Sequence, residues 1–183
     1  MNLHTMSFKV LSVAVVALLS GSAFGYTSTS SFDATADVQA ALTVDCTSDV
    51  RFGKIIYRAA NTAAIVTVAA TAAGAVSSND ASVIPVGGNG SAACTIANEG
   101  SDGTPSDATA ALSGAGGTWT SPTLAGVLLD DGATHTLSSS LTLSKTAAIG
   151  DETVYIGGAL SIPTALAFAG IYTSSAVTLT VTD

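Results

Sequence analysis

The chain has 183 residues, of which 48% are hydrophobic and 10% are charged, and its formal net charge is −8. A high apolar fraction with sparse charges excludes a disordered chain, and the acidic balance leaves no electrostatic footprint for nucleic acid or for an anionic membrane. Alanine, threonine, serine, glycine and valine dominate, which favours an all-β domain with small side chains and many turns.

The first 25 residues are expected to be a secretory signal peptide. Lys9 ends a short polar region, and the apolar run Val10–Leu19 is too short to span a bilayer. Small residues follow in Ser20–Gly25, and we expect cleavage after Gly25. Removing these 25 residues leaves 158, and because Lys9 is the only charged residue removed, the net charge becomes −9. The mature chain is long enough for one domain with its own core, and no insertion into a membrane is expected.

The segment from Phe32 to Cys46 alternates between apolar and polar residues, with Ala41 as the one apolar residue at a polar position. Its apolar positions are Phe32, Ala34, Ala36, Val38, Ala40, Leu42, Val44 and Cys46. Period-2 alternation predicts a strand with one dry and one wet face. Fifteen residues would span roughly 50 Å, whereas a typical strand has about 5–6 residues. Either this strand bends and changes sheets, or its first half leaves its own domain and pairs with something else.

The two cysteines, Cys46 and Cys94, both follow the expected signal peptide. An even pair in a secreted chain predicts a disulfide, which would stabilise the fold by roughly 4 kcal/mol in the chain-entropy model. A zinc site is poorly supported, because two cysteines and the one mature histidine, His135, do not complete its ligand set.

Further strands are expected along the rest of the chain, separated by turn-rich segments. The expected strands are Val38–Cys46, Ala64–Ala69, Val83–Val86, Ala92–Ala97, Thr134–Leu143, Thr153–Ile156, Leu160–Ile162 and Ile171–Val181. The expected turns are Ser77–Asp80, Gly87–Gly90, Asp130–Gly132 and Gly157–Gly158. Seven or eight short strands with frequent turns indicate a β-sandwich.

The segments between these strands predict a hairpin, a long loop and a short helix. Asp131-Gly132, between Val127–Leu129 and Thr134–Leu143, indicates a hairpin. Asn98 to Pro122 is rich in glycine, serine and aspartate and predicts a long surface loop that carries Trp119. Pro163–Ala169 could form a short helix, since proline is tolerated in a first helical turn.

Two parts of the chain resemble a known family. The first is Leu42–Cys46 followed by Val50–Ile55, in which a cysteine precedes a Phe-Gly pair. The second is Val154–Ile162 with an Ile-Gly-Gly sequence, then the Gly-x-Tyr sequence of Ala169–Tyr172 and the strand Val177–Val181. Together they resemble a secreted bacterial pilin-like domain family of unknown function, which is similar to spore coat protein U and chaperone–usher pilin domains. The stretch from Asn98 to Pro122 departs from the pattern and looks enlarged.

The resemblance implies an all-β, immunoglobulin-like sandwich at the cell surface, in which one strand is missing and a neighbour's N-terminal extension fills the gap. The corresponding division is a signal peptide at 1–25, a donor-strand extension at 26–40 and a sandwich domain at 41–183. The expected interface residues of the donor strand are Phe32, Ala34, Ala36, Val38 and Ala40.

The alternating segment supports the same arrangement. If a disulfide fixes Leu42–Cys46 in its own domain, Phe32–Ala40 projects, and a neighbour's groove could bury its apolar face and pair its backbone. Such a head-to-tail contact builds an open filament. The alternative is that the strand bends at Ala40-Ala41 and completes its own sandwich as a monomer.

Residues that carry chemistry are sparse, and we expect no catalytic site, no metal and no cofactor. As a general base His135 would need an activated serine and an orienting acid, and because no serine has a nucleophile-elbow pattern around it, His135 is read as a surface or strand-end histidine. Calcium could bind at Asn98–Gly103 with Asp107, or at Asp130–Gly132, but turn chemistry explains both sequences. Asn89-Gly90-Ser91 matches the glycosylation pattern and is read as a glycine-rich turn.

The leading hypothesis is a structural subunit of an extracellular filament or pilus, with copies of itself and a possible periplasmic chaperone and usher as partners. The alternative is a monomeric secreted surface or adhesive module that recognises glycans through Trp119 and the enlarged loop.

Overall fold

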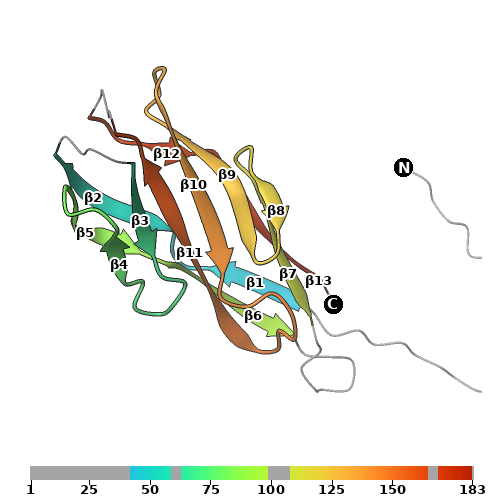
Figure 1. Ribbon diagram of the computed structural model, residues 1–183. Helices are drawn as coiled ribbons and strands as arrows, with labels where there is room; N and C mark the ends of the chain where they lie inside the picture. Colours follow the sequence, from blue (N-terminus) through green and yellow to red (C-terminus); the bar gives the residue numbers. More distant parts are fainter. Residues whose placement is uncertain (1–41, 59–62, 99–107, 165–168, 183) are drawn as a thin grey trace, which may run out of the picture. The chain divides into compact units, whose positions relative to one another are not determined.

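The computed structural model describes residues 42–58, 63–98, 108–164 and 169–182 of the chain. Within these residues the fold is all-β and antiparallel, as the composition predicted (Figure 1). No helix long and apolar enough to cross a membrane occurs in the described part. The strands are β1 (Leu42–Cys46), β2 (Arg51–Tyr57), β3 (Ala64–Val68), β4 (Val76–Ser78), β5 (Val83–Gly90), β6 (Ala92–Asn98), β7 (Thr109–Gly114), β8 (Thr118–Thr120), β9 (Thr123–Asp130), β10 (Thr136–Leu143), β11 (Glu152–Ile162), β12 (Thr173–Ser174) and β13 (Val177–Thr182).

The strands form one large curled sheet and two small two-stranded sheets. The large sheet has the order β1-β6-β11-β10-β9-β12, with β3 beside the second half of β11, β4 beside β3, and β8 beside β9. The two small sheets are β2–β5 and β7–β13. They cover different parts of the large sheet, as their core contacts show.

A long two-stranded ribbon connects the large sheet to one of the small ones. Its first strand is β1 continued by β2, and its second is β5 continued by β6, with Cys46 opposite Cys94 and Arg51 opposite Gly90. The crossing is held by Thr47, whose N–H donates to the Ala93 carbonyl at 3.0 Å, and by the Ser48 hydroxyl, which accepts from the Ala93 N–H at 3.0 Å. The described part of the long alternating strand is β1 alone, which stays in the large sheet, so the two outcomes expected for that strand remain predictions.

Two apolar clusters make up the core. The first lies under the β7–β13 sheet and has residues of β6, β7, β9, β10 and β11, including Leu112 and Ile96 at 1% exposure. The alternating strand β13 contributes Val177, Leu179 and Val181 to it. The second cluster lies under the β2–β5 sheet and contains Phe52, Ala64, Val66, Val68, Val83, Leu137, Leu160 and Ile162.

The expected turn at Gly157–Gly158 is wrong, because both glycines lie inside the eleven-residue strand β11. A Cβ on Gly157 would lie 2.3 Å from the Val68 carbonyl oxygen, and one on Gly158 would lie 2.4 Å from the Ser140 carbonyl oxygen. The glycines therefore serve close approach between strands rather than chain reversal. The expected turn at Gly87–Gly90 is also wrong, since these residues belong to β5.

The long loop expected from Asn98 to Pro122 is corrected where the structure describes it. Strands β7 and β8 occupy much of this stretch, and Ala110, Leu112 and Ala115 are buried in the first cluster. The small side chains that made the stretch look like a loop allow β7 to pack closely. The predicted hairpin at Asp131-Gly132 is confirmed, since β9 and β10 pair from Asp130 and Thr136 onward.

The alternating sequence of β1 predicts one buried face, but this face is largely exposed in the fold. Leu42 packs partly against the first cluster, but Val44 is 39% exposed, because β1 is the edge strand of the large sheet. The signal peptide and the whole extension 26–40 lie outside the described residues, as does most of the expected helix at Pro163–Ala169.

Candidate functional site

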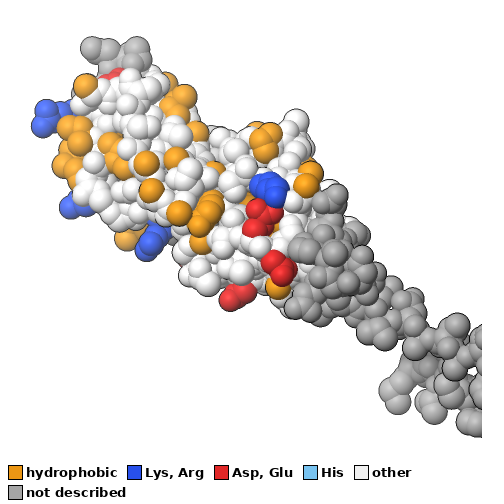
Figure 2. Space-filling view, turned by 90° about the horizontal axis from the view of Figure 1, so that it is seen from below, with side chains coloured by type: hydrophobic (Ala, Val, Ile, Leu, Met, Phe, Trp, Pro, Cys, Tyr) orange, Lys and Arg blue, Asp and Glu red, His pale blue; other side chains and the backbone are white. Residues whose placement is uncertain are grey.

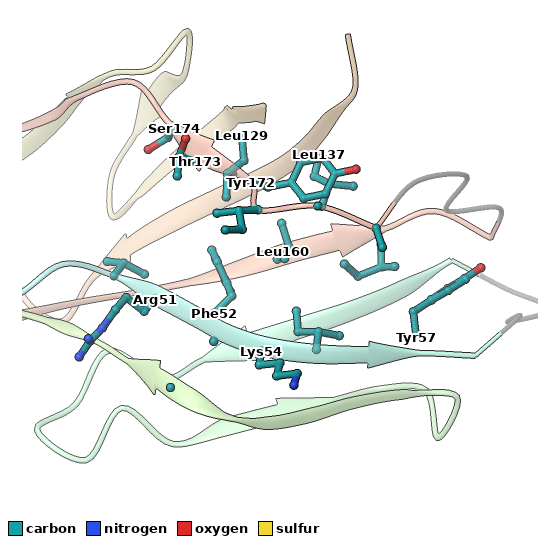
Figure 3. A pocket seen from close by; sticks show the side chains of 18 of the residues that line it. Arg51, Phe52, Lys54, Tyr57, Leu129, Leu137, Leu160, Tyr172, Thr173 and Ser174 are labelled. Atoms are coloured by element: carbon teal, nitrogen blue, oxygen red, sulfur yellow. The ribbon is translucent and has the colours of Figure 1, made fainter. Parts of the chain in front are cut away.

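A groove of about 980 Å³ lies between β2 and the segment Ala169–Ser174. Figure 3 shows its two walls, with side chains of the large sheet between them. The groove is lined by Asp49, Val50, Arg51, Phe52, Gly53, Lys54, Ile55, Tyr57, Gly88, Leu129, Leu137, Leu160, Ile162, Ala169, Gly170, Ile171, Tyr172, Thr173 and Ser174.

The floor of the groove is apolar and belongs to the second core cluster. Leu137, Leu160 and Ile162 are 5%, 4% and 3% exposed, and half-buried Leu129 lies beside them. In Figure 3 the side chains of Leu129, Leu137 and Leu160 point into the space between the walls. The floor of the groove is therefore the surface of a hydrophobic core whose side chains are almost fully buried, and the exposed apolar side chain that lines the groove is Ile171.

The first wall is β2, whose shape depends on a glycine. Gly53 has a φ of +76°, and a Cβ there would lie 2.4 Å from the Gly87 carbonyl oxygen, so only glycine fits without strain. This irregular point changes the alternation of the strand. Phe52 is buried and Ile55 packs against the same cluster, while Lys54 between them is exposed.

The opposite wall carries the most exposed large apolar side chain of the described residues. Ile171 is 85% exposed although it lines the groove. The segment is anchored through β12, where Thr173 pairs with Asp130 of β9. Near Gly170 the wall lies against the β9–β10 hairpin, because a Cβ on Gly170 would be 3.5 Å from Asp131 Cβ. The Tyr57 hydroxyl donates a hydrogen bond to the Thr164 carbonyl and links β2 to the end of β11.

Each wall offers a strand edge to the groove. In the described part of the chain β2 has one strand partner, β5, and β12 has one strand partner, β9. Residues of both strands line the groove, although β12 contributes only Thr173 and Ser174. Backbone N–H and C=O groups at such an edge are a template for a further strand.

The first wall is also basic. Arg51 and Lys54 of β2 and the adjacent Arg58 are exposed, and the Arg58 N–H extends the ladder by donating to the Ser82 carbonyl at 2.9 Å. Figure 2 shows most Lys and Arg side chains at the end of the molecule where β2 and β5 lie, and most of the visible acidic side chains farther along it. The fourth cation of the described chain, Lys145, forms an ion pair with Glu152.

The hairpin next to the second wall holds an Asp–His pair. Asp131 Oδ2 and His135 Nδ1 are 2.6 Å apart, and Asp131 Oδ1 accepts from the backbone N–H groups of Ala133 and His135. The hydrogen bond from the His135 side chain, together with these backbone hydrogen bonds, lowers the pKa of Asp131 from 3.8 to about 2. Gly132 N–H is bound by Asp130 Oδ1 at 3.0 Å, so both carboxylates of this candidate calcium sequence support the turn.

Other candidate chemistry from the sequence finds structural roles in the described residues. No group of three His, Cys, Asp or Glu side chains is placed there to hold a metal ion. Trp119 of β8 is half-buried against the first cluster. Asn89 and Gly90 lie in β5 rather than in the expected turn, Ser91 lies between β5 and β6, and the Asn89 side-chain amide donates to the Gly74 carbonyl at 3.2 Å.

Of the site residues expected from the sequence, the cysteines are placed and the donor residues are not. The predicted disulfide between Cys46 and Cys94 is confirmed, and it joins opposite residues of β1 and β6. Phe32, Ala34, Ala36, Val38 and Ala40 lie outside the described residues. The sequence did not predict the groove residues Leu137, Leu160 and Ile171 as a site. They come from β10, β11 and the segment Ala169–Ser174, which only the topology brings together.

Comparisons of the chain with protein-family models, with curated proteins and with solved structures found no match.

Proposed function

We propose that the protein is a structural subunit of an extracellular filament and that the N-terminal extension of one copy fills the groove of the next. The observation that carries this proposal is the groove itself, which has an apolar floor, the exposed Ile171 on one wall, and on the other wall β2, whose one strand partner in the described residues is β5. An immunoglobulin-like sandwich that lacks one strand would present such a groove.

The length and pattern of the extension match this groove. The wall from Asp49 to Tyr57 has nine residues, which span about 30 Å as a strand. The segment Phe32–Ala40 also has nine residues, and its alternation would direct Phe32, Ala34, Ala36, Val38 and Ala40 to one face. That face would cover Leu137, Leu160 and Ile171 while the polar residues stay in water.

Insertion is favourable on two counts. Fully burying a side chain such as Phe32 or Val38 contributes about 1.5–3 kcal/mol, so the five residues together contribute several kcal/mol. The backbone of the inserted strand would also pair with both edges of the groove. These gains offset the ordering of the extension, which is smallest when the groove is already formed.

A filament follows from the geometry of the chain. The disulfide at Cys46 ties β1 to its own domain, so the extension that precedes it starts from a fixed point. Because the extension and the groove are different surfaces, the contact is head-to-tail and repeats without closing. A disulfide is compatible with a location outside the cytoplasm, as expected for a secreted subunit.

Cysteine cross-linking between two full-length chains tests this proposal. One chain carries Ala36→Cys and an affinity tag, and the other carries Ile171→Cys, so each has one free thiol besides the Cys46–Cys94 disulfide. Mixing them under oxidising conditions should give a tagged disulfide-linked dimer, seen on a non-reducing gel. Val86→Cys is the matched control, because Val86 is 46% exposed but does not line the groove, and it should not cross-link.

The same thiols separate exchange from self-completion. A single chain with both Ala36→Cys and Ile171→Cys should form linked multimers if the extension enters a neighbour. A monomer that gains an internal disulfide at every protein concentration would contradict the filament and support folding of the extension onto its own domain. Electron microscopy of the secreted wild-type protein then shows whether fibres form.

A further inference from the structure

We infer that Arg51, Lys54 and Arg58 form a basic rim that recognises the acidic face of the incoming extension and so selects it for the groove. This inference rests on the proposed function and adds the chemistry of its partner segment. In the described chain the two ion pairs are Asp131–His135 and Lys145–Glu152, so the three cations of the rim take part in neither.

The rim lies on the outer side of the groove wall. Figure 3 shows Arg51 and Lys54 directed away from the side chains that fill the space between the walls, whereas Phe52 is directed toward them. A strand inserted beside β2 presents its own outward residues on this same outer face. Cross-strand neighbours on one face of a sheet interact, and opposite charges there are stabilising.

The extension supplies the complementary charges at the right face. Between the apolar residues of Phe32–Ala40 stand Asp33 and Asp37, which would point outward when Phe32 and Val38 point into the groove. Asp33 and Asp37 are four residues apart, as are Lys54 and Arg58, so both pairs have a spacing of about 13 Å along a strand.

The charges along the β2 wall favour binding of the acidic residues of the extension at one end of it. Asp49 lines the groove just before β2 begins, whereas Lys54 and Arg58 lie toward its far end. Acidic residues of the extension are therefore repelled from the Asp49 end and attracted to the Lys54–Arg58 end. Exposed charges of this kind change association rates and salt dependence more than they change final affinity.

Charge reversal in the full-length protein tests the pairing. The tail variant is Asp33→Lys with Asp37→Lys, and the body variant is Lys54→Glu with Arg58→Glu. Each alone should assemble at least about tenfold more slowly than wild type at low salt, as light scattering measures. A chain with all four changes should assemble at a rate within about twofold of wild type, because its lysine-bearing extension meets a glutamate-bearing wall. An equal mixture of the two variants should recover to the same extent, because the extension of each variant matches the groove wall of the other.

The outcomes separate this inference from the proposed function. Asp45→Lys reverses an exposed acid outside the extension and should assemble at the wild-type rate. If both charge variants assemble like wild type, or if the mixture is no faster than either variant, the basic rim does not select the extension. If deletion of residues 26–39 leaves assembly intact, the proposed function itself is wrong.

Discussion

The two halves of the core differ in how they are covered. The first cluster lies under β7 and β13, and β13 closes it with Val177, Leu179 and Val181 from the same chain. The second cluster lies under β2 and β5, and the groove beside β2 leaves Leu137, Leu160 and Ile162 at its floor. One half is thus closed by β13, whereas the other borders the groove.

An alternating strand therefore need not cover the apolar core of its own chain. Val177–Val181 has the same alternation as Phe32–Ala40, and it pairs with Ala110–Gly114 of β7. The half beside the groove has β2 at its border, which pairs with β5 alone in the described residues. Folded proteins rarely leave a long strand edge uncovered.

The largest effect is expected for charges placed in the extension. Phe32→Asp or Val38→Asp should abolish assembly, because each removes about 1.5–3 kcal/mol of burial and would place a charge over the apolar floor. The unfolding midpoint of the secreted monomer should not change. Thr35→Asp, on the polar side of the same segment, is the control and should assemble. Normal polymers of both apolar-site variants would show that the donor segment is misassigned.

The disulfide belongs to the closed half, and its removal should cost about 4 kcal/mol of unfolding free energy in the chain-entropy model. Cys46 and Cys94 are separated by 48 residues, which sets the size of the loop that the bond closes. Replacing both with alanine and measuring urea unfolding tests this value. Reduction of the wild-type protein should give a similar loss, and an unchanged midpoint in both experiments would contradict it.

The same leucine-to-alanine substitution should lower the free energy of unfolding by different amounts in the two halves of the core. Leu112→Ala in the closed half should cost about 3–4 kcal/mol, because Leu112 is 1% exposed and its cavity has no route to water. Leu160→Ala at the groove floor should cost about 2–3 kcal/mol in the monomer, since its site borders the open groove. Leu160→Ala should also weaken assembly, whereas Leu112→Ala should not. Equal effects of both variants on stability and on assembly would remove the distinction between the halves.

The smallest effect concerns the hairpin next to the groove. Asp131 has a folded pKa of about 2, below its ordinary value of 3.8, so its pair with His135 stabilises the fold above about pH 4. This contribution should be lost as the pH falls from about 4 to about 2. Thermal unfolding of wild type and Asp131→Asn from pH 2 to pH 6 measures it, with Asp45→Asn as the surface control. Parallel midpoints for wild type and Asp131→Asn across this range would show that the pair contributes nothing.

The sequence predicted correctly those elements whose conformation is set by residues close together in the chain. Asp131-Gly132 predicted its hairpin, and alternation predicted β13, because turn chemistry and period-2 burial act within a few residues. Gly157–Gly158 misled because glycine marks close packing as well as turns. Only the fold places Gly157 against β3 and Gly158 against β10.

The all-β class, the disulfide pair and the alternating segment Phe32–Cys46 were all readable in the amino-acid sequence. These follow from composition, cysteine number and the twofold period of a strand. The groove was decided by the tertiary structure alone. Its walls and floor come from β2, β9, β10, β11 and Ala169–Ser174, and pairing between residues so far apart in the chain leaves no local signal in any of them.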